Sequence, residues 1–203
     1  MKILAVGDIE SRYYYTHYQE GRLEGLDLII ACGDLSKNYL EFLVTMARCP
    51  LLYVPGNHDD DFAENPPEGC VCIDGRIYTF RGVRILGLGG SFRYRKKAKF
   101  MYTEKQMQRR FRRLRLSLWR HGGFDILVTH APARHINDFD TLPHRGFECF
   151  RTLLEKYKPA LFIHGHVHMN YGMNIPRKTV FGDTLIINAF EHCLIEHEWE
   201  ETK

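Results

Sequence analysis

Five short apolar runs in this chain each lead into polar side chains, and this repeated arrangement restricts the fold more than any other feature of the sequence. The runs cover residues 2–6, 26–32, 51–54, 124–129 and 160–163. They are mostly apolar and do not alternate with polar residues, as is typical of strands in a sheet that is covered on both faces. The polar residues that follow them are Asp8, Asp34, Asn57 with His58, His130, and His166 with His168. We therefore expect a sheet with polar side chains gathered at one edge.

The segments between these runs predict an α/β fold. Residues 39–48 place Leu40, Leu43 and Val44 at helical spacing, which indicates a crossover helix between parallel strands. Asp74-Gly75 and Arg81-Gly82 divide residues 70–87 into short pieces, typical of antiparallel additions to a sheet. The pattern further predicts helices over 12–20, 103–121 and 145–158, and short strands over 178–181, 184–188 and 194–199.

Composition indicates one globular domain over residues 1–203. The chain is 44% hydrophobic and 26% charged, and its length suits a single domain with a sizeable core. Residues 1–6 are too short for a signal peptide's apolar region, and no apolar stretch is long enough to cross a bilayer. Six cysteines without a C-x-x-C pair are expected to be reduced. We expect a cytoplasmic protein without a membrane partner.

The polar residues at the run ends form a metal-binding set. In open α/β sheets the carboxyl ends of the strands make the ligand-binding edge, so these residues should converge. Carboxylate, amide oxygen and imidazole suit Mn²⁺, Fe or Zn²⁺ better than Ca²⁺, which prefers oxygen alone. His166 and His168 point the same way if their segment is extended. Because the set exceeds what one ion takes, we expect two ions, and Asp34 can bridge them.

The order of the motifs resembles the signature of calcineurin-like metallophosphoesterases. The matching stretches are Asp8-Ile9-Glu10, Gly33-Asp34, Gly56-Asn57-His58-Asp59, Thr129-His130 and Gly165-His166-Val167-His168. The resemblance implies an αββα sandwich, in which helices flank two central mixed β-sheets, and a dinuclear metal centre.

The resemblance also implies a role for each residue. Asp8, Asp34 and His168 would bind one ion, and Asp34 would bridge to the other, bound by Asn57, His130 and His166. His58 would ligate neither ion and would act beside the scissile phosphate as an acid or transition-state stabiliser. The implied reaction is hydrolysis of a small phosphodiester or phosphomonoester, nucleotides being the first candidates, by in-line attack of a metal-bridging hydroxide.

Glu10 departs from the family pattern, because it stands where the family has histidine. A glutamate ligand would favour two Mn²⁺ or Fe²⁺ ions, with Zn²⁺ as the alternative. We predict Glu10 as a ligand; if it fails to reach, one ion is weak or absent. Lys37 and Pro55 stand where protein Ser/Thr phosphatases have aspartate and arginine, so that activity is disfavoured. The motifs more closely resemble the small phosphodiesterase branch.

Basic residues leave two questions open. Arg93 and Arg95 follow Gly90 in a loop and are predicted to contact the phosphate of the substrate. The basic region from Arg93 to Arg115 leaves a nuclease with a nucleic-acid partner as an alternative. A non-catalytic interaction scaffold is the other alternative, although a scaffold has no use for His58. The sequence does not determine the oligomeric state.

Overall fold

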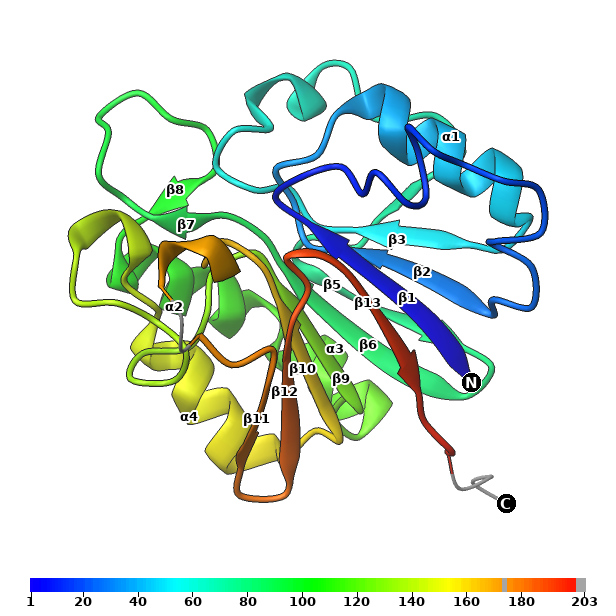
Figure 1. The fold of residues 1–203 in the computed structure, drawn as a ribbon. Coiled ribbons are helices and arrows are strands. Elements are labelled where there is room, and N and C mark those ends of the chain that lie inside the picture. The colour runs from blue at the N-terminus through cyan, green and yellow to red at the C-terminus, as the bar shows by residue number, and fades with distance from the viewer. Residues whose placement is uncertain (173–174, 200–203) are drawn as a thin grey trace.

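Two β-sheets packed face to face form the centre of the molecule (Figure 1). The structure, a computed structural model, describes residues 1–172 and 175–199. The first sheet has the order β13 (Glu191–Glu196), β1 (Lys2–Gly7), β2 (Leu28–Ala31), β3 (Leu51–Tyr53), β4 (Val71–Cys72). The second has the order β11 (Lys178–Phe181), β12 (Thr184–Asn188), β10 (Leu161–His164), β9 (Ile126–Thr129), β6 (Val83–Leu88), β5 (Arg76–Phe80). A small parallel pair, β7 (Ser91–Phe92) and β8 (Met101–Tyr102), lies beside them.

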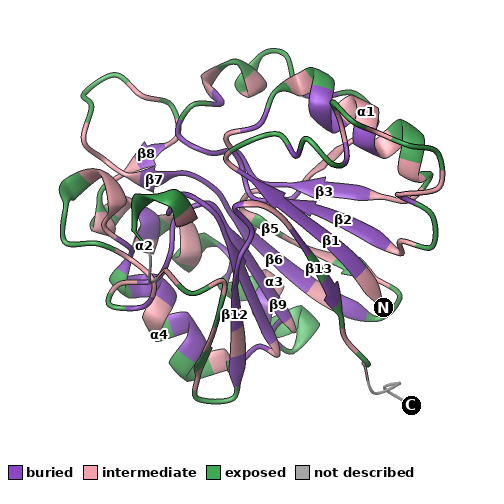
Figure 2. Ribbon diagram, viewed as in Figure 1, coloured by how far each residue is buried: buried purple, intermediate pink, exposed green. Residues whose placement is uncertain are grey.

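Helices cover the outer face of each sheet. The helix α1 (Lys37–Ala47) packs on the first sheet, and α2 (Glu104–Arg113), α3 (Arg115–His121) and α4 (Glu148–Tyr157) pack on the second. Along β1, Ile3 and Ala5 face the other sheet while Leu4 and Val6 face α1. Both faces of the strand are therefore buried, which is why its sequence is apolar from Ile3 to Val6 (Figure 2). The predicted αββα fold with two mixed sheets is confirmed.

Strand direction brings the run ends together. β1, β2 and β3 pair in parallel, and so do β6, β9, β10 and β12. Antiparallel strands occur at the margins, where β13 pairs with β1, β5 with β6, and β11 with β12. Within each sheet, the strands that precede predicted ligands are thus parallel to one another: β1, β2 and β3 in the first sheet, β9 and β10 in the second. This agrees with the crossover pattern.

Helix 103–121 begins and ends as predicted but is not continuous. The Thr103 hydroxyl accepts the Gln106 backbone N–H in a capping box, and Gly122 ends the second half in a left-handed conformation. A tight turn at Leu114 divides it into α2 and α3. Arginines at i,i+3 and i,i+4 spacing repel one another and disfavour a single uninterrupted helix. Leu114 and Leu118 are both buried against the second sheet.

Three other predicted elements differ from the structure. Residues 12–20 form turns rather than a helix, because Tyr14 packs on His192 while Tyr15 and Tyr18 pack on Phe42 of α1. A single helix could not direct these tyrosines both toward His192 and toward Phe42. The last strand runs over Glu191–Glu196 instead of 194–199, because it pairs with the whole of β1. β4 pairs in parallel with β3, not as part of a hairpin.

All six cysteines are free thiols. Among the residues that the structure describes, no helix combines the length and the apolar character needed to cross a membrane.

Candidate metal centre

Three of the predicted ligands have an unusual backbone conformation. Asp8, Asp34 and His166 have φ values of 68°, 56° and 68°, in the left-handed region that side chains with a Cβ seldom adopt. Each such residue costs about 1–3 kcal/mol and persists where the surroundings hold it. Here the His166 N–H donates to Asp8 Oδ1 at 2.7 Å and the Asp8 N–H donates to the Gly33 carbonyl at 3.0 Å. The strain lies where the strand ends meet.

Four possible metal-ligand atoms from four different loops meet at His130, whose Nε2 is one of them. Its Nε2 lies 3.0 Å from Asn57 Oδ1, 3.0 Å from His166 Nδ1 and 3.3 Å from Asp34 Oδ2. Asp34, His130 and His166 thus offer ligand atoms within 4.8 Å of one another. His130 and Asn57 are buried.

His130 and His166 each make a hydrogen bond through the ring nitrogen that faces away from the centre, and this bond fixes the orientation of the ring. His130 Nδ1 donates to the Cys32 carbonyl at 2.7 Å, and His166 Nε2 donates to the Pro143 carbonyl at 2.6 Å. These partners assign the tautomer, because a carbonyl only accepts. In the neutral rings, the nitrogens that face the centre therefore carry lone pairs, and they meet two oxygen acceptors. Such a cluster needs a cation or a proton between its members.

The pKa values describe how the centre meets this need without a metal. Burial opposes the charge of His130, yet Asp34 and Asp8 raise the pKa of His130 to about 9. The pKa of Asp34 lies below its ordinary value, because the His130 charge and hydrogen bond outweigh the effect of burial. Burial and the neighbouring His130 charge lower the pKa of His166 to about 3. A proton on His130 thus occupies the place that a cation would take.

A second group of donors surrounds Asp8. Its side chain is fully buried, and its Oδ2 has no hydrogen-bond partner among the described residues. Burial raises the pKa of Asp8 to about 7. His168 Nε2 lies 4.0 Å from Asp8 Oδ1. Gly165 closes the other side, since a Cβ there would lie 2.9 Å from Asp8 Oδ2. A cation here would satisfy the orphaned oxygen.

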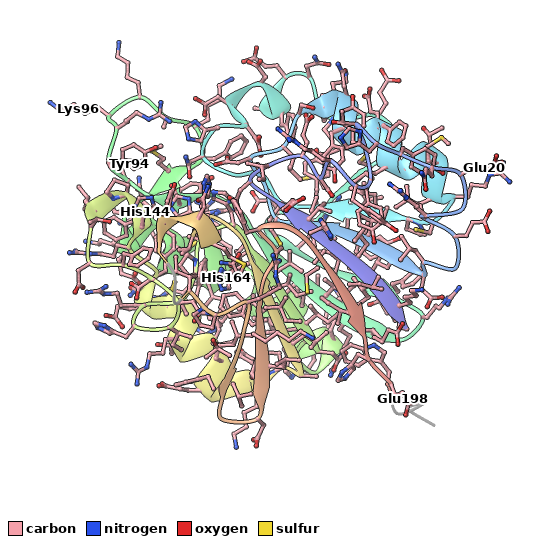
Figure 3. All side chains as sticks on the ribbon, viewed as in Figure 1. Glu20, Tyr94, Lys96, His144, His164 and Glu198 are labelled. Atoms are coloured by element: carbon pink, nitrogen blue, oxygen red, sulfur yellow. The ribbon has the colours of Figure 1, made fainter. Side chains whose placement is uncertain are left out.

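A cavity of about 390 Å³ lies over both donor groups. His58 is exposed beside it, and the His58 backbone N–H donates to Asp34 Oδ1 at 2.8 Å. Figure 3 shows the labelled Tyr94 and His144 at this end of the molecule, while Lys96 points outward. The residues that line the cavity are Asp8, Asp34, Asn57, His58, Tyr94, Pro143, His144, His166, His168 and Tyr171.

Comparison with known proteins identifies the family. The model of calcineurin-like phosphoesterases matches residues 1–170 of the chain. The chain belongs to the calcineurin-like phosphoesterase family. A search of curated proteins finds no match.

Solved structures agree with this membership at the level of the fold. A crystal structure of TT1561 from Thermus thermophilus is 17% identical, with a TM-score of 0.61 over 94% of this chain and 89% of that one. Another crystal structure is 17% identical, with a TM-score of 0.63 over 94% of this chain and 90% of the other.

The donor set of this calcineurin-like phosphoesterase fits the metal dependence of its family. Two features carry the fit: the convergent lone pairs around His130, and the buried Asp8 oxygen without a partner among the described residues. Seven predicted residues therefore lie together. His130 is buried against Asn57 and His166. The other six line the cavity: Asp8, Asp34, Asn57, His58, His166 and His168.

The other three predicted site residues, Glu10, Arg93 and Arg95, are not part of the cavity lining. The Glu10 side chain is exposed and accepts a hydrogen bond from Ser36 Oγ at 2.5 Å, outside the lining of the cavity. Arg93 donates to the Met101 carbonyl between β7 and β8. Arg95 is close to the centre, where its Nη2 donates to the Asn57 carbonyl at 3.4 Å.

Sequence reasoning missed four lining residues: Tyr94, Pro143, His144 and Tyr171. Tyr94 lies between the two predicted arginines, so its position in the loop was a signal that charge alone did not capture. The His144 ring packs against His166 at a tilt, and the Tyr171 ring stacks on His168. No spacing pattern in the sequence indicates these contacts.

Proposed function

We propose that the cavity at the strand ends hydrolyses a small phosphodiester or phosphomonoester, with His58 as the acid or transition-state stabiliser. Family membership supports metal-dependent phosphoester hydrolysis in general. One observation supports this cavity as the site of the reaction. Buried lone pairs that need a cation converge beside the exposed His58, whose backbone N–H donates to Asp34.

We propose two divalent ions, Mn²⁺ or Fe²⁺, with Zn²⁺ as the alternative. Asn57, His130 and His166 would hold one, Asp8, His168 and Glu10 the other, and Asp34 both. When bound, such ions supply Lewis-acid stabilisation of the phosphoryl oxygens and a nucleophilic water. Glu10 would have to leave Ser36 to take part, which its exposed position allows.

His58 would act on the leaving group. Because its side chain is exposed at the cavity and is not held among the convergent donors, it is free to contact the ester oxygen. Histidine changes its charge near neutral pH, so it can donate a proton to a leaving alkoxide. Arg95 would contribute positive charge at the rim, and Arg93 a weaker, longer-range charge.

Kinetics of His58→Ala test the proposal. Hydrolysis of bis-p-nitrophenyl phosphate and p-nitrophenyl phosphate is measured with Mn²⁺, together with an alkyl ester whose leaving group needs a proton. We expect loss of about 10²–10⁴-fold on the alkyl ester and a smaller loss on the nitrophenyl esters. His17→Ala, at an exposed histidine on another face, serves as the matched control. Full activity of His58→Ala on the alkyl ester would contradict the acid role.

The alternatives make different predictions. Complete absence of metal-dependent turnover by the wild type would support the scaffold. Cleavage of DNA or RNA in preference to small esters would support the nuclease. One of its basic residues, Arg110, is already paired with Asp74 at 2.5 Å. The cytoplasmic location stays a prediction.

A further inference from the structure

A second cavity, of about 240 Å³, adjoins the metal centre on the other side of His58. It lies between the N-terminus of α1 and the 3₁₀ turn over Asp60–Ala63. His58 lines both this cavity and the one over the metal ligands. One histidine side chain therefore stands between two spaces that a single substrate could fill. The other lining residues that matter here are Ser36, Lys37, Asp61, Phe62 and Asn65.

The polar groups of this second cavity are held in place. Lys37 Nζ donates to Asn65 Oδ1 at 2.6 Å and lies 3.6 Å from Glu41 Oε1. The Lys37 side chain is 26% exposed, so it is positioned and not free in solvent. An ammonium group offers three N–H donors, and a carboxamide both donates and accepts. These groups match hydroxyl groups.

The charge and the volume of the second cavity restrict the kind of group that it can bind. Glu41 pairs with Lys37, and Asp61 adds a carboxylate to the lining of the cavity. This negative charge disfavours a second phosphate and favours a neutral group. The volume is below the about 300–1,000 Å³ of sites for drug-sized ligands, so the cavity suits a group of sugar size. Phe62, partly buried at the wall, offers an apolar surface for the carbon skeleton.

We propose that the second cavity, here called the Lys37–Asn65 cavity, binds the alcohol that leaves the phosphorus, and that this alcohol is a neutral polyhydroxyl compound such as a sugar or nucleoside. This inference rests on the proposed function, because it uses His58 as the acid. The acid must touch the leaving oxygen, so the rest of the alcohol extends past His58 into this cavity. The other ester group of a diester would remain near Tyr94 and Tyr171.

The reaction is balanced with water as the second reactant. The oxygen of water forms a new bond to phosphorus while the bond from phosphorus to the ester oxygen breaks with its electron pair. His58 gives its proton to that oxygen, and the alcohol is released into the Lys37–Asn65 cavity. The proton lost by the attacking water returns through solvent to His58.

Leaving-group selectivity tests the inference. Two substrate pairs differ in the alcohol: β-glycerophosphate against p-nitrophenyl phosphate, and a dinucleoside monophosphate against bis-p-nitrophenyl phosphate. In Lys37→Met and Asn65→Leu, we expect kcat/KM for the polyhydroxyl ester relative to the nitrophenyl ester to fall at least tenfold. Lys178→Met is the control, because Lys178 is an exposed lysine of β11 that does not line the second cavity, and this variant should keep the wild-type ratio. Circular dichroism and the Tm establish that the variants are folded.

The possible results separate this inference from the proposed function. Metal-dependent turnover with an unchanged ratio in both variants would overturn the inference alone. So would a wild type that hydrolyses only the nitrophenyl esters of both pairs. A wild type without metal-dependent turnover of any ester would overturn the proposed function, and the inference with it.

Discussion

The Asp59 carboxylate holds Asp34 in its left-handed conformation. Asp59 Oδ2 accepts the backbone N–H of Asp34 at 2.8 Å and that of Gly56 at 2.7 Å. One buried oxygen thus ties the loop after β2 to the loop after β3. Burial, and then the nearby Asp34 charge, raise the pKa of Asp59 to about 6. Burial thus makes the ionised Asp59 less stable than it would be in water, and the two N–H donors offset part of this cost.

Asp59→Ala should lower the free energy of unfolding by about 2–6 kcal/mol, because the backbone N–H groups of Asp34 and Gly56 lose their acceptor at about 1–3 kcal/mol each. Chemical denaturation measures the change. Asp59→Asn keeps an acceptor oxygen and should lose less. Equal losses in the two variants would show that the acceptor is not what stabilises these loops.

Gly56→Ala should destabilise the protein and weaken metal binding. A Cβ at Gly56 would lie 2.1 Å from Asp34 Oδ1 and 2.6 Å from its backbone nitrogen, so a ligand must move. We expect a loss at the upper end of about 1–3 kcal/mol. Gly7→Ala is the matched control, because its Cβ would meet nothing nearer than 3.5 Å. Thermal denaturation and Mn²⁺ titration should separate the two variants.

Mn²⁺ binding should strengthen between pH 6 and 9. Without a metal, His130 keeps a proton below a pKa of about 9 and Asp8 below about 7. Both must lose it to bind a cation, so each proton displaced raises the affinity up to about tenfold per pH unit below the pKa of its group. Calorimetry in buffers of different ionisation enthalpy counts the protons released. An affinity independent of pH in this range would argue against these ligands.

Elemental analysis after reconstitution should find two Mn²⁺ ions per chain. Glu10→Ala should weaken the ion at Asp8 and leave the ion at His130 bound, because Asn57, His130 and His166 lie apart from Glu10. Wild-type affinity for both ions in Glu10→Ala would remove Glu10 from the ligand set.

Acid should destabilise the wild type more than Asp125→Asn. Burial of Asp125 is outweighed by hydrogen bonds from Arg84, which hold the pKa of Asp125 below its ordinary 3.8. Its contribution to stability is therefore present above about pH 4 and is lost as the pH falls through the lower, folded-state pKa. Denaturation curves at pH 7 and pH 3 measure the difference. In the variant, the pH-dependent loss should be smaller.

Much of the fold was predictable because strands buried on both faces and helices with one apolar face leave clear patterns. Thr103 and Gly122 marked the ends of a helix through local chemistry alone. The turn at Leu114 was not predictable, because no glycine or proline marks it. The turns over residues 12–20 were not predictable, because they depend on what the tyrosines pack against. The shifted last strand likewise follows from pairing with β1, a contact between opposite ends of the chain.

The sequence by itself determined the parallel sheets, the family motifs and the chemical types of the metal-binding side chains, because these follow from local periodicity and residue chemistry. Only the tertiary structure decided how these side chains meet: lone pairs around His130, an orphaned oxygen on Asp8, and Glu10 on Ser36. It also placed Tyr94, His144 and the Lys37–Asn65 cavity beside His58. The reason is physical, since distances between residues far apart in sequence are set by the packing of whole sheets and not by any local preference.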